Sequence, residues 1–259
     1  FLRAFAGGLY PGTPYFDRKS VVFYPYDPAS AKALLAEIGF ADTDNNGILN
    51  WTDGALKGKD VVIQLTAHED QAACAMIAET LLPMFREVGI QVNYRPVTSA
   101  IGDQNVNEGA WQMRVNRPGQ EFAVPFARWN QIAPIMSMNP LWHRAGAQPR
   151  ELLPFENDLI KLATQFSEEK DFAKQKELMF QYNKIATENC YNIGLVIGRY
   201  GLSLAKRFKN IPISTPSFMY QWDWDNWRAE QVWIAPEDQA KYPETAPQTI
   251  PLPTDYKKP

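Results

Sequence analysis

Residues 60–97 constrain the fold most, because two short apolar runs flank one long helical pattern. The run DVVIQLTA at 60–67 is rich in Val and Ile and is typical of a buried strand. A helix is predicted over 70–88, with a kink at Pro83, and a second strand over 90–97. A strand–helix–strand unit implies parallel strands joined by a right-handed crossover, so the sequence predicts an α/β fold. The helix side chains predicted to face inward are Ala73, Met76, Ile77, Thr80, Leu81, Met84 and Val88.

A third strand is predicted over 111–116, after a weaker helix over 99–107. Successive side chains of a strand point to opposite faces. One face is predicted to carry Gln112, Arg114 and Asn116, and the other Trp111, Met113 and Val115. The polar face opens into a loop and is suited to hydrogen bonding with a ligand. The alternative is a solvated strand edge with ordinary surface groups.

Residues 26–51 form a second segment with clear boundary signals, in which a helix ends in an acidic turn. Asp27 is the predicted N-cap, and Pro28 occupies the first helical position, where its missing N–H costs nothing. Gly39 is predicted to end the helix in a left-handed conformation. The apolar stripe of this helix consists of Ala31, Leu34, Leu35 and Ile38, at helical spacing.

The turn that follows matches an EF-hand loop at several positions. The predicted ligands for a hard cation such as Ca²⁺ are Asp42, Asp44, Asn46, Ile48 and Asp53. The loop departs from the motif because Asp53 replaces the usual bidentate Glu, and a turn and a strand follow it in place of a helix. The alternative is an Asx-rich turn that holds itself by side-chain-to-backbone hydrogen bonds. No other cofactor is expected.

These motifs together resemble one protein family. The YDPxxAKxLLxExG helix, the D-x-D-x-N-G turn and the run ILNWTDG are similar to the extracellular solute-binding proteins of ABC importers, of the oligopeptide/dipeptide-binding family (family 5). The similarity is to the carboxy-terminal portion of proteins that are usually much longer, so a fragment is expected. The resemblance implies a periplasmic binding protein type II-like lobe, with a mixed β-sheet flanked by helices and a C-terminal return segment.

The resemblance also implies a domain division and a function. Residues 1–25 would form an inter-lobe crossing, 26–200 the α/β ligand-binding lobe, and 201–259 a return segment toward a mostly absent first lobe. The protein would be a periplasmic or extracytoplasmic monomer that captures an oligopeptide or similar solute between two lobes and delivers it to a membrane permease. The alternatives are an oligosaccharide-binding member of the same family and, in a different class, an oligosaccharide-acting hydrolase. A fragment that lacks half of the cleft is expected to bind ligand weakly or not at all.

The ligand-facing residues are predicted within and after the strand over 111–116. Peptide-binding members of the family carry W-x-x-D-x-P-D-P near here, and its aspartate pairs with the ammonium group of a peptide. This chain has N-R-P-G-Q-E instead, which puts a standard peptide ligand in doubt, with Glu121 as a candidate replacement for the acid. Residues 117–150 have no regular period and are rich in aromatic residues, Met and Arg, which favours an ordered ligand-facing loop. The predicted ligand-binding residues are Trp111, Arg114, Asn116, Arg117, Gln120, Glu121, Trp129 and Trp142; core packing is the alternative for each Trp.

The remaining elements follow from ordinary boundary signals. Helices are predicted over 155–166 and 172–189, the second capped by Asp171, and a strand follows over 192–197. A short strand is predicted over 20–24, in the Gly- and Pro-rich opening. The tail carries a tryptophan cluster that is assigned to structure, namely Trp222, Trp224 and Trp227.

Composition excludes several functional classes. The chain has 26 Lys and Arg against 29 Asp and Glu, so neither a nucleic acid nor an anionic membrane surface is an expected partner. No apolar run approaches the roughly 18 residues of a membrane-spanning helix. Cys74 and Cys190 are predicted to be buried free thiols, with one bridge as the alternative. His68 and His143 lie far apart, and no HExxH, CxxC, GxSxG or phosphate loop occurs, so an enzyme is not expected. A glycosidase that uses Glu121 is the best enzymatic alternative.

Overall fold

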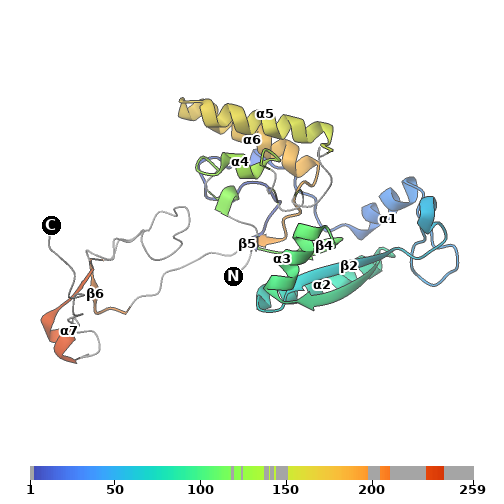
Figure 1. Cartoon of the computed structure of the whole chain (residues 1–259), viewed down its shortest axis with the longest axis horizontal. Coiled ribbons are helices and arrows are strands. Elements are labelled where there is room, and N and C mark those ends of the chain that lie inside the picture. The colour runs from blue at the N-terminus through green and yellow to red at the C-terminus, as the bar shows by residue number, and fades with distance from the viewer. Residues whose placement is uncertain are drawn as a thin grey trace. The chain divides into compact units, whose positions relative to one another are not determined.

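The computed structural model describes residues 3–117, 120–123, 125–136, 140, 143, 151–197, 205–210 and 232–241 (Figure 1). The chain divides into two compact units. One is Ala4–Val196, and the other joins Phe1–Arg3 to Ile197–Pro259. The predicted division into 1–25, 26–200 and 201–259 stays a prediction.

A three-stranded parallel sheet forms in the larger unit, as the strand–helix–strand pattern predicts. Its strands β2 (Val62–His68), β3 (Gln91–Val97) and β4 (Met113–Val115) stand in the order β3-β2-β4. Helix α2 (Ala72–Glu87) joins β2 to β3, and α3 (Ser99–Glu108) joins β3 to β4. All these elements were predicted, with boundaries that differ by at most two residues.

The two faces of the sheet are covered by different helices. Leu65, Tyr94 and Met113 lie side by side in the register and pack against α2. We call this cluster the sheet core; its buried members are Leu65, Ala67, Cys74, Ala78 and Val115. The opposite face carries Thr66, His68 and Arg114, and it faces α3.

The predicted inner stripe of α2 is partly wrong. Met76 is 67% exposed and Met84 is 38% exposed, whereas Cys74 and Ala78 are buried. The helix is therefore rotated relative to the predicted stripe. Its contact face carries Cys74 and Ala78 together with Ile77, Leu81 and Leu82, so Ile77 and Leu81 of the predicted stripe do pack against the sheet.

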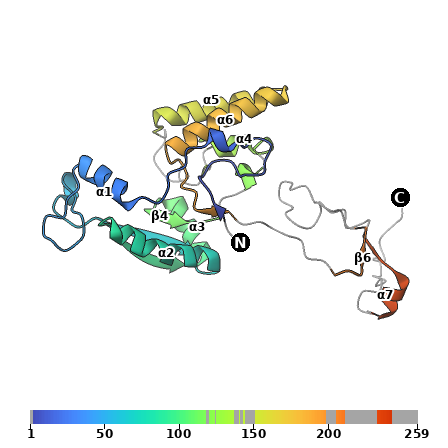
Figure 2. The same cartoon turned by 180° about the vertical axis from the view of Figure 1, so that it is seen from behind.

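A second cluster of buried side chains, which we call the helical core, forms around two long helices. Helices α5 (Pro154–Glu168) and α6 (Phe172–Glu188) lie side by side, as Figures 1 and 2 show, and Asp171 caps α6 as predicted by accepting from the Lys174 amide. The shorter elements η3 (Gln120–Phe122) and α4 (Trp129–Ile132) contribute to the same core. Its buried members are Leu9, Phe122, Ile132, Ala133, Leu159, Leu162, Ala163, Phe166, Met179, Tyr182 and Ala186.

The amino-terminal segment is part of the helical core. The Leu9 amide donates to Oδ1 of Asn183 (2.9 Å), and the Val22 amide donates to Oγ1 of Thr187 (2.9 Å). The strand predicted over 20–24 does not form. A 3₁₀ turn, η1 (Arg18–Ser20), ends at the first residue of this range, and the Val22 amide donates a hydrogen bond to α6 rather than to a neighbouring strand. Whether this segment also crosses between lobes stays a prediction.

Helix α1 (Pro28–Glu37) begins and ends as predicted. Asp27 accepts a hydrogen bond from the Ser30 amide, and Gly39 has a φ of +96°. Its predicted apolar stripe, however, is not buried: Leu34 is 62% exposed and Ile38 67% exposed. A short 3₁₀ turn, η2 (Gly54–Leu56), follows the acidic loop.

The remaining described elements are short. Strand β1 (Arg3–Ala4) pairs with β5 (Val196–Ile197), which is shorter than the strand predicted over 192–197. In the smaller unit, β6 (Phe208–Lys209) pairs antiparallel with β7 (Trp233–Ile234), and α7 (Pro236–Lys241) follows. The predicted cluster of Trp222, Trp224 and Trp227 lies outside the described residues. Among the residues that the structure describes, no helix has the length and apolar character needed to cross a membrane.

We predict that Asn183→Ala lowers the free energy of unfolding by about 1–3 kcal/mol, because it leaves the buried Leu9 amide without its acceptor. Urea unfolding followed by circular dichroism measures the change. Gln181→Ala, on the exposed side of the same helix, is the matched control. Equal midpoints for the two variants would show that the Leu9–Asn183 bond does not stabilise the helical core.

Candidate functional site

The predicted ligand residues of the third strand lie around β4, at the edge of the sheet. Trp111, Asn116 and Arg117 flank the strand, and Trp111 and Asn116 are half-buried, whereas Arg117 is exposed. Asn116 and Arg117 follow the carboxyl end of β4. Because β4 runs parallel to β2, the carboxyl ends of both strands meet at the same edge of the sheet, which is where ligands bind in open α/β sheets. The predicted alternation is confirmed, since Met113 and Val115 join the sheet core and Arg114 faces the other way.

Arg114 differs from these neighbours because its side chain is only 7% exposed. Its guanidinium donates through Nη2 to Nε2 of His68 and to Oδ1 of Asp103 (3.2 Å). Through Nη1 it donates to the carbonyl oxygen of Gly102 (3.5 Å), and among the described residues the buried Nε has no hydrogen-bond partner. The contact between Arg114 and ligand stays a prediction, and the side chain is already engaged within the fold.

His68 connects Arg114 to the start of α3. Its Nδ1 lies 3.2 Å from Oγ of Ser99, and that hydroxyl donates to Oδ2 of Asp70 (2.7 Å). A Cβ atom added at Gly102 would lie 2.6 Å from Nε2 of His68, so only glycine fits between α3 and the ring. Sequence analysis did not predict this cluster. The signal in the sequence is a histidine, His68, directly after a buried apolar run.

Glu121 and Trp129 lie in a different place from the β4 residues, because both are associated with the helical core. Trp129 packs against that core, and a carboxylate oxygen of Glu121 lies 4.0 Å from Nη1 of Arg128. The neighbouring Tyr182 hydroxyl donates to the Ile132 carbonyl, and burial, with a smaller contribution from Glu121, raises the pKa of Tyr182. Gln120 begins η3, and Trp142 lies outside the described residues. The ligand contacts predicted for these residues stay predictions.

A buried ion pair anchors the start of α5. Glu156, which is 2% exposed, pairs with Nε2 of His143 and accepts from the Leu153 amide through Oε2 (2.8 Å). Burial alone would raise the pKa of Glu156, but hydrogen bonds from His143, the Leu153 amide and Tyr191 outweigh it, so the pKa is lowered. The sequence signal for this pair is an acid in the first turn of a predicted helix.

The acidic loop is held by its own hydrogen bonds. Asp42 accepts from the amides of Gly47 (2.8 Å) and Asn46 (3.2 Å), and Asn46 accepts from the Ile48 amide (2.7 Å). Partial desolvation would raise the pKa of Asp42, but the bonds from Gly47 and Asn46 outweigh it and lower the pKa. Asp53 is the N-cap residue of η2 and makes no side-chain capping bond there.

These bonds agree with the Asx-turn alternative for the loop. Across the described part of the chain, no three His, Cys, Asp or Glu side chains gather as a metal ion would require. The oxygens of Asp42, Asp44 and Asn46 that would bind Ca²⁺ face donors within the loop. The Ca²⁺ site therefore stays a prediction.

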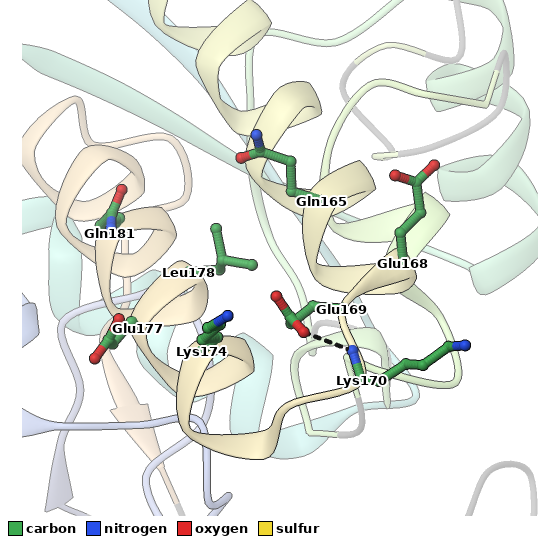
Figure 3. A pocket seen from close by; sticks show the side chains of 8 residues that line it. All are labelled: Gln165, Glu168, Glu169, Lys170, Lys174, Glu177, Leu178 and Gln181. Carbon is green, nitrogen blue, oxygen red and sulfur yellow. Dashed lines mark hydrogen bonds between the residues drawn. The ribbon is translucent and has the colours of Figure 1, made fainter.

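A groove of about 550 Å³ lies where α5 turns into α6 (Figure 3). Within the turn, the Lys170 amide donates to a carboxylate oxygen of Glu169 (2.8 Å). None of the predicted ligand residues lines this groove. The lining residues are Gln165, Glu168, Glu169, Lys170, Lys174, Glu177, Leu178 and Gln181.

Sequence comparison places the chain in a known family. Residues 4–133, half of the chain, match the profile described as bacterial extracellular solute-binding proteins, family 5 middle. The chain belongs to this family. The matched range includes α1, the acidic loop and the whole parallel sheet, so the family resemblance of residues 26–51 is confirmed.

Two named relatives differ in what their names say they bind. The chain is 33% identical over 253 residues to a periplasmic alpha-galactoside-binding protein of Rhizobium meliloti. The alignment covers 97% of this chain and 36% of that protein. It is 21% identical over 215 residues to the oligopeptide-binding protein AppA of Bacillus subtilis, covering 82% of this chain and 35% of AppA. The chain thus spans about a third of the length of the curated relatives it matches.

Solved structures show the same fold. The periplasmic binding protein MelB of Agrobacterium fabrum, in complex with stachyose, matches with a TM-score of 0.78 and 33% identity, over 91% of this chain and 35% of MelB. AppA of Bacillus subtilis, in complex with a nonapeptide, matches with a TM-score of 0.63 and 17% identity, over 90% of this chain and 42% of AppA. The predicted periplasmic-binding-protein fold is therefore confirmed.

We predict that Glu156→Gln destabilises the chain by about 1–3 kcal/mol at neutral pH, because the buried His143 loses a charged partner. The lowered pKa means that the ionised form stabilises the fold. This contribution is complete above the ordinary value of 4.5 and is lost as pH falls through the folded-state pKa. Urea unfolding between pH 3.5 and 7 should show the wild type converging on the variant at low pH. The exposed Glu168→Gln is the control, and a pH-independent difference would contradict this role of Glu156.

If the acidic loop binds Ca²⁺, the free energy of unfolding rises by about 2.7 kcal/mol at a Ca²⁺ concentration 100 times Kd. Thermal melts in Ca²⁺ and in chelator measure the shift. Asp53→Ala removes a predicted ligand that makes no capping bond, so this variant should lose the shift while its Tm in chelator is unchanged. A wild-type Tm that is the same in Ca²⁺ and in chelator would leave only the self-bonded turn.

Proposed function

We propose that this chain is part of the solute-binding component of an ABC importer and that its solute is an oligosaccharide of the α-galactoside class. The observation that carries the proposal is the 33% identity that extends over 97% of the chain to a protein named for binding α-galactosides. The same identity to a protein in complex with stachyose supports it. Identity to the oligopeptide-binding relative is only 21%, so the oligosaccharide alternative is preferred to the peptide default.

The residues around β4 agree with an uncharged ligand. The family's acidic peptide motif is replaced by N-R-P-G-Q-E, so the carboxylate that pairs with a peptide's ammonium group is missing at that position. Glu121, the candidate replacement, has Arg128 beside it at 4.0 Å, which compensates its charge. A neutral sugar needs flat apolar faces and polar groups rather than a free charge, and Trp111 and Asn116 are of these types.

The proposed mechanism is capture rather than chemistry. Family membership supports a binding role, and the chain would supply one side of a cleft that closes on its ligand by a hinge motion. The closed form would then be recognised by a membrane permease, outside the cytoplasm, as the names of the periplasmic relatives suggest. Residues 1–259 alone are expected to bind weakly, because the relatives are about three times longer.

We predict that the full polypeptide containing this sequence binds stachyose saturably at one site and does not bind a nonapeptide. Calorimetry with both ligands measures the difference. Trp111→Ala should weaken stachyose binding about thirtyfold, the effect of losing about 2 kcal/mol of contact energy. Trp51→Ala is the matched control, because Trp51 packs on Phe40 beside the acidic loop. Binding of the nonapeptide without binding of stachyose would restore the peptide prediction.

A further inference from the structure

We infer that Arg114 and His68 together position the end of β4, and that neither contacts the ligand. The inference rests on the proposed function, since it concerns the segment that presents Trp111, Asn116 and Arg117. It assigns a role to a cluster around the buried side chains of Arg114 and His68 that ligand binding itself does not use. The cluster consists of His68, Asp70, Gln71, Ser99, Asp103 and Arg114.

Strand β4 needs support beyond its ladder. It has only three residues, Met113–Val115, and it pairs with β2 over Leu65–Ala67 at the edge of the sheet. A three-residue edge strand makes few ladder bonds, so its ends fray readily. The side chain of Gln112 gives some help, because its Oε1 accepts from the Gln64 amide (2.7 Å) just before the ladder begins.

Arg114 supplies the missing support on the other side. From the middle of β4 its guanidinium reaches the last residue of β2, through His68, and the first half of α3, through Gly102 and Asp103. Arginine is always charged and offers only donors, so Nε2 of His68 must present a lone pair to it. On the other side of the ring, Nδ1 of His68 lies 3.2 Å from Oγ of Ser99 and 3.0 Å from Nε2 of Gln71.

These contacts form one connected network. Arg114 donates to His68, Nδ1 of His68 contacts Ser99 and Gln71, and Ser99 donates to Asp70. The network links β4, β2 and the amino-terminal end of α3, and Asp103 balances the arginine charge at 3.2 Å. A connected network fixes each member's rotamer, which is what holding a neighbouring site in place requires.

The experiment is a double-mutant cycle in the full polypeptide, with Arg114→Met, His68→Phe and the double variant. We expect each single variant to weaken stachyose binding about tenfold and the double variant to weaken it no further, because each single change already breaks the network. His68→Gln keeps an acceptor for Arg114 and should retain most of the affinity. Arg86→Met, on the exposed surface of α2, is the matched control for removing an arginine. A loss in Arg114→Met with full affinity in His68→Phe would mean that Arg114 binds ligand directly and would overturn the inference.

Hydrogen exchange without ligand separates this inference from the proposed function. The β4 amides should exchange about tenfold faster in Arg114→Met and His68→Phe and at the wild-type rate in His68→Gln. Asp103→Asn, at a side chain that is 60% exposed, is a milder variant that should fold and should accelerate the same amides. Wild-type protein that does not bind stachyose, with these exchange changes present, would reject the proposed function and keep the positioning role. Unchanged exchange in all variants would reject the positioning role.

Discussion

The larger unit depends on hydrogen bonds between α6 and a segment of chain that precedes it by more than 160 residues. The side chain of Asn183 accepts a hydrogen bond from the buried Leu9 amide, and that of Thr187 accepts one from the partly buried Val22 amide. Such buried amides are costly when unpaired, so these two acceptors determine where the amino-terminal segment lies. Because the contact joins the two ends of the unit, every element from α1 to α5 lies within the loop that it closes. The parallel sheet, with the end that is predicted to face ligand, is thereby attached to the helical core at both ends.

The sequence predicted the elements that local chemistry determines. Asp27 and Asp171 cap helices as expected, Gly39 is left-handed, and the apolar runs at 60–67 and 90–97 form parallel strands. The errors concern which side of an element is covered. Periodicity identified the apolar stripe of α1 but could not show that this stripe faces solvent. Whether a helix face is buried depends on which distant segments of the chain pack against it. The run over 20–24 has the composition of a strand, yet none of the described residues pairs with it as a strand, because the Val22 amide bonds to α6.

The site was predictable to a similar extent. Alternation along β4 placed Arg114 opposite Met113 and Val115, which is correct, but no local signal indicated that α3 would enclose its guanidinium. That enclosure depends on Gly102, whose lack of a side chain matters only once His68 lies beside it. The departure from the acidic peptide motif is the more useful signal, because it indicates a ligand other than a standard peptide and agrees with the identity to an α-galactoside-binding relative.

The close approach of two glycines has a consequence for how the unit assembles. A Cβ atom on Gly194 would lie 2.1 Å from the Gly7 nitrogen, so the backbones there touch directly. Residues 5–9 reach their final position only after residues 183–195 have emerged from the ribosome, whereas the contacts within the sheet join residues at most about fifty positions apart. The sheet core therefore has the low contact order that favours early folding, and the helical core has the high contact order that delays it. During synthesis, the amino-terminal segment waits without its partner while the parallel sheet can already form.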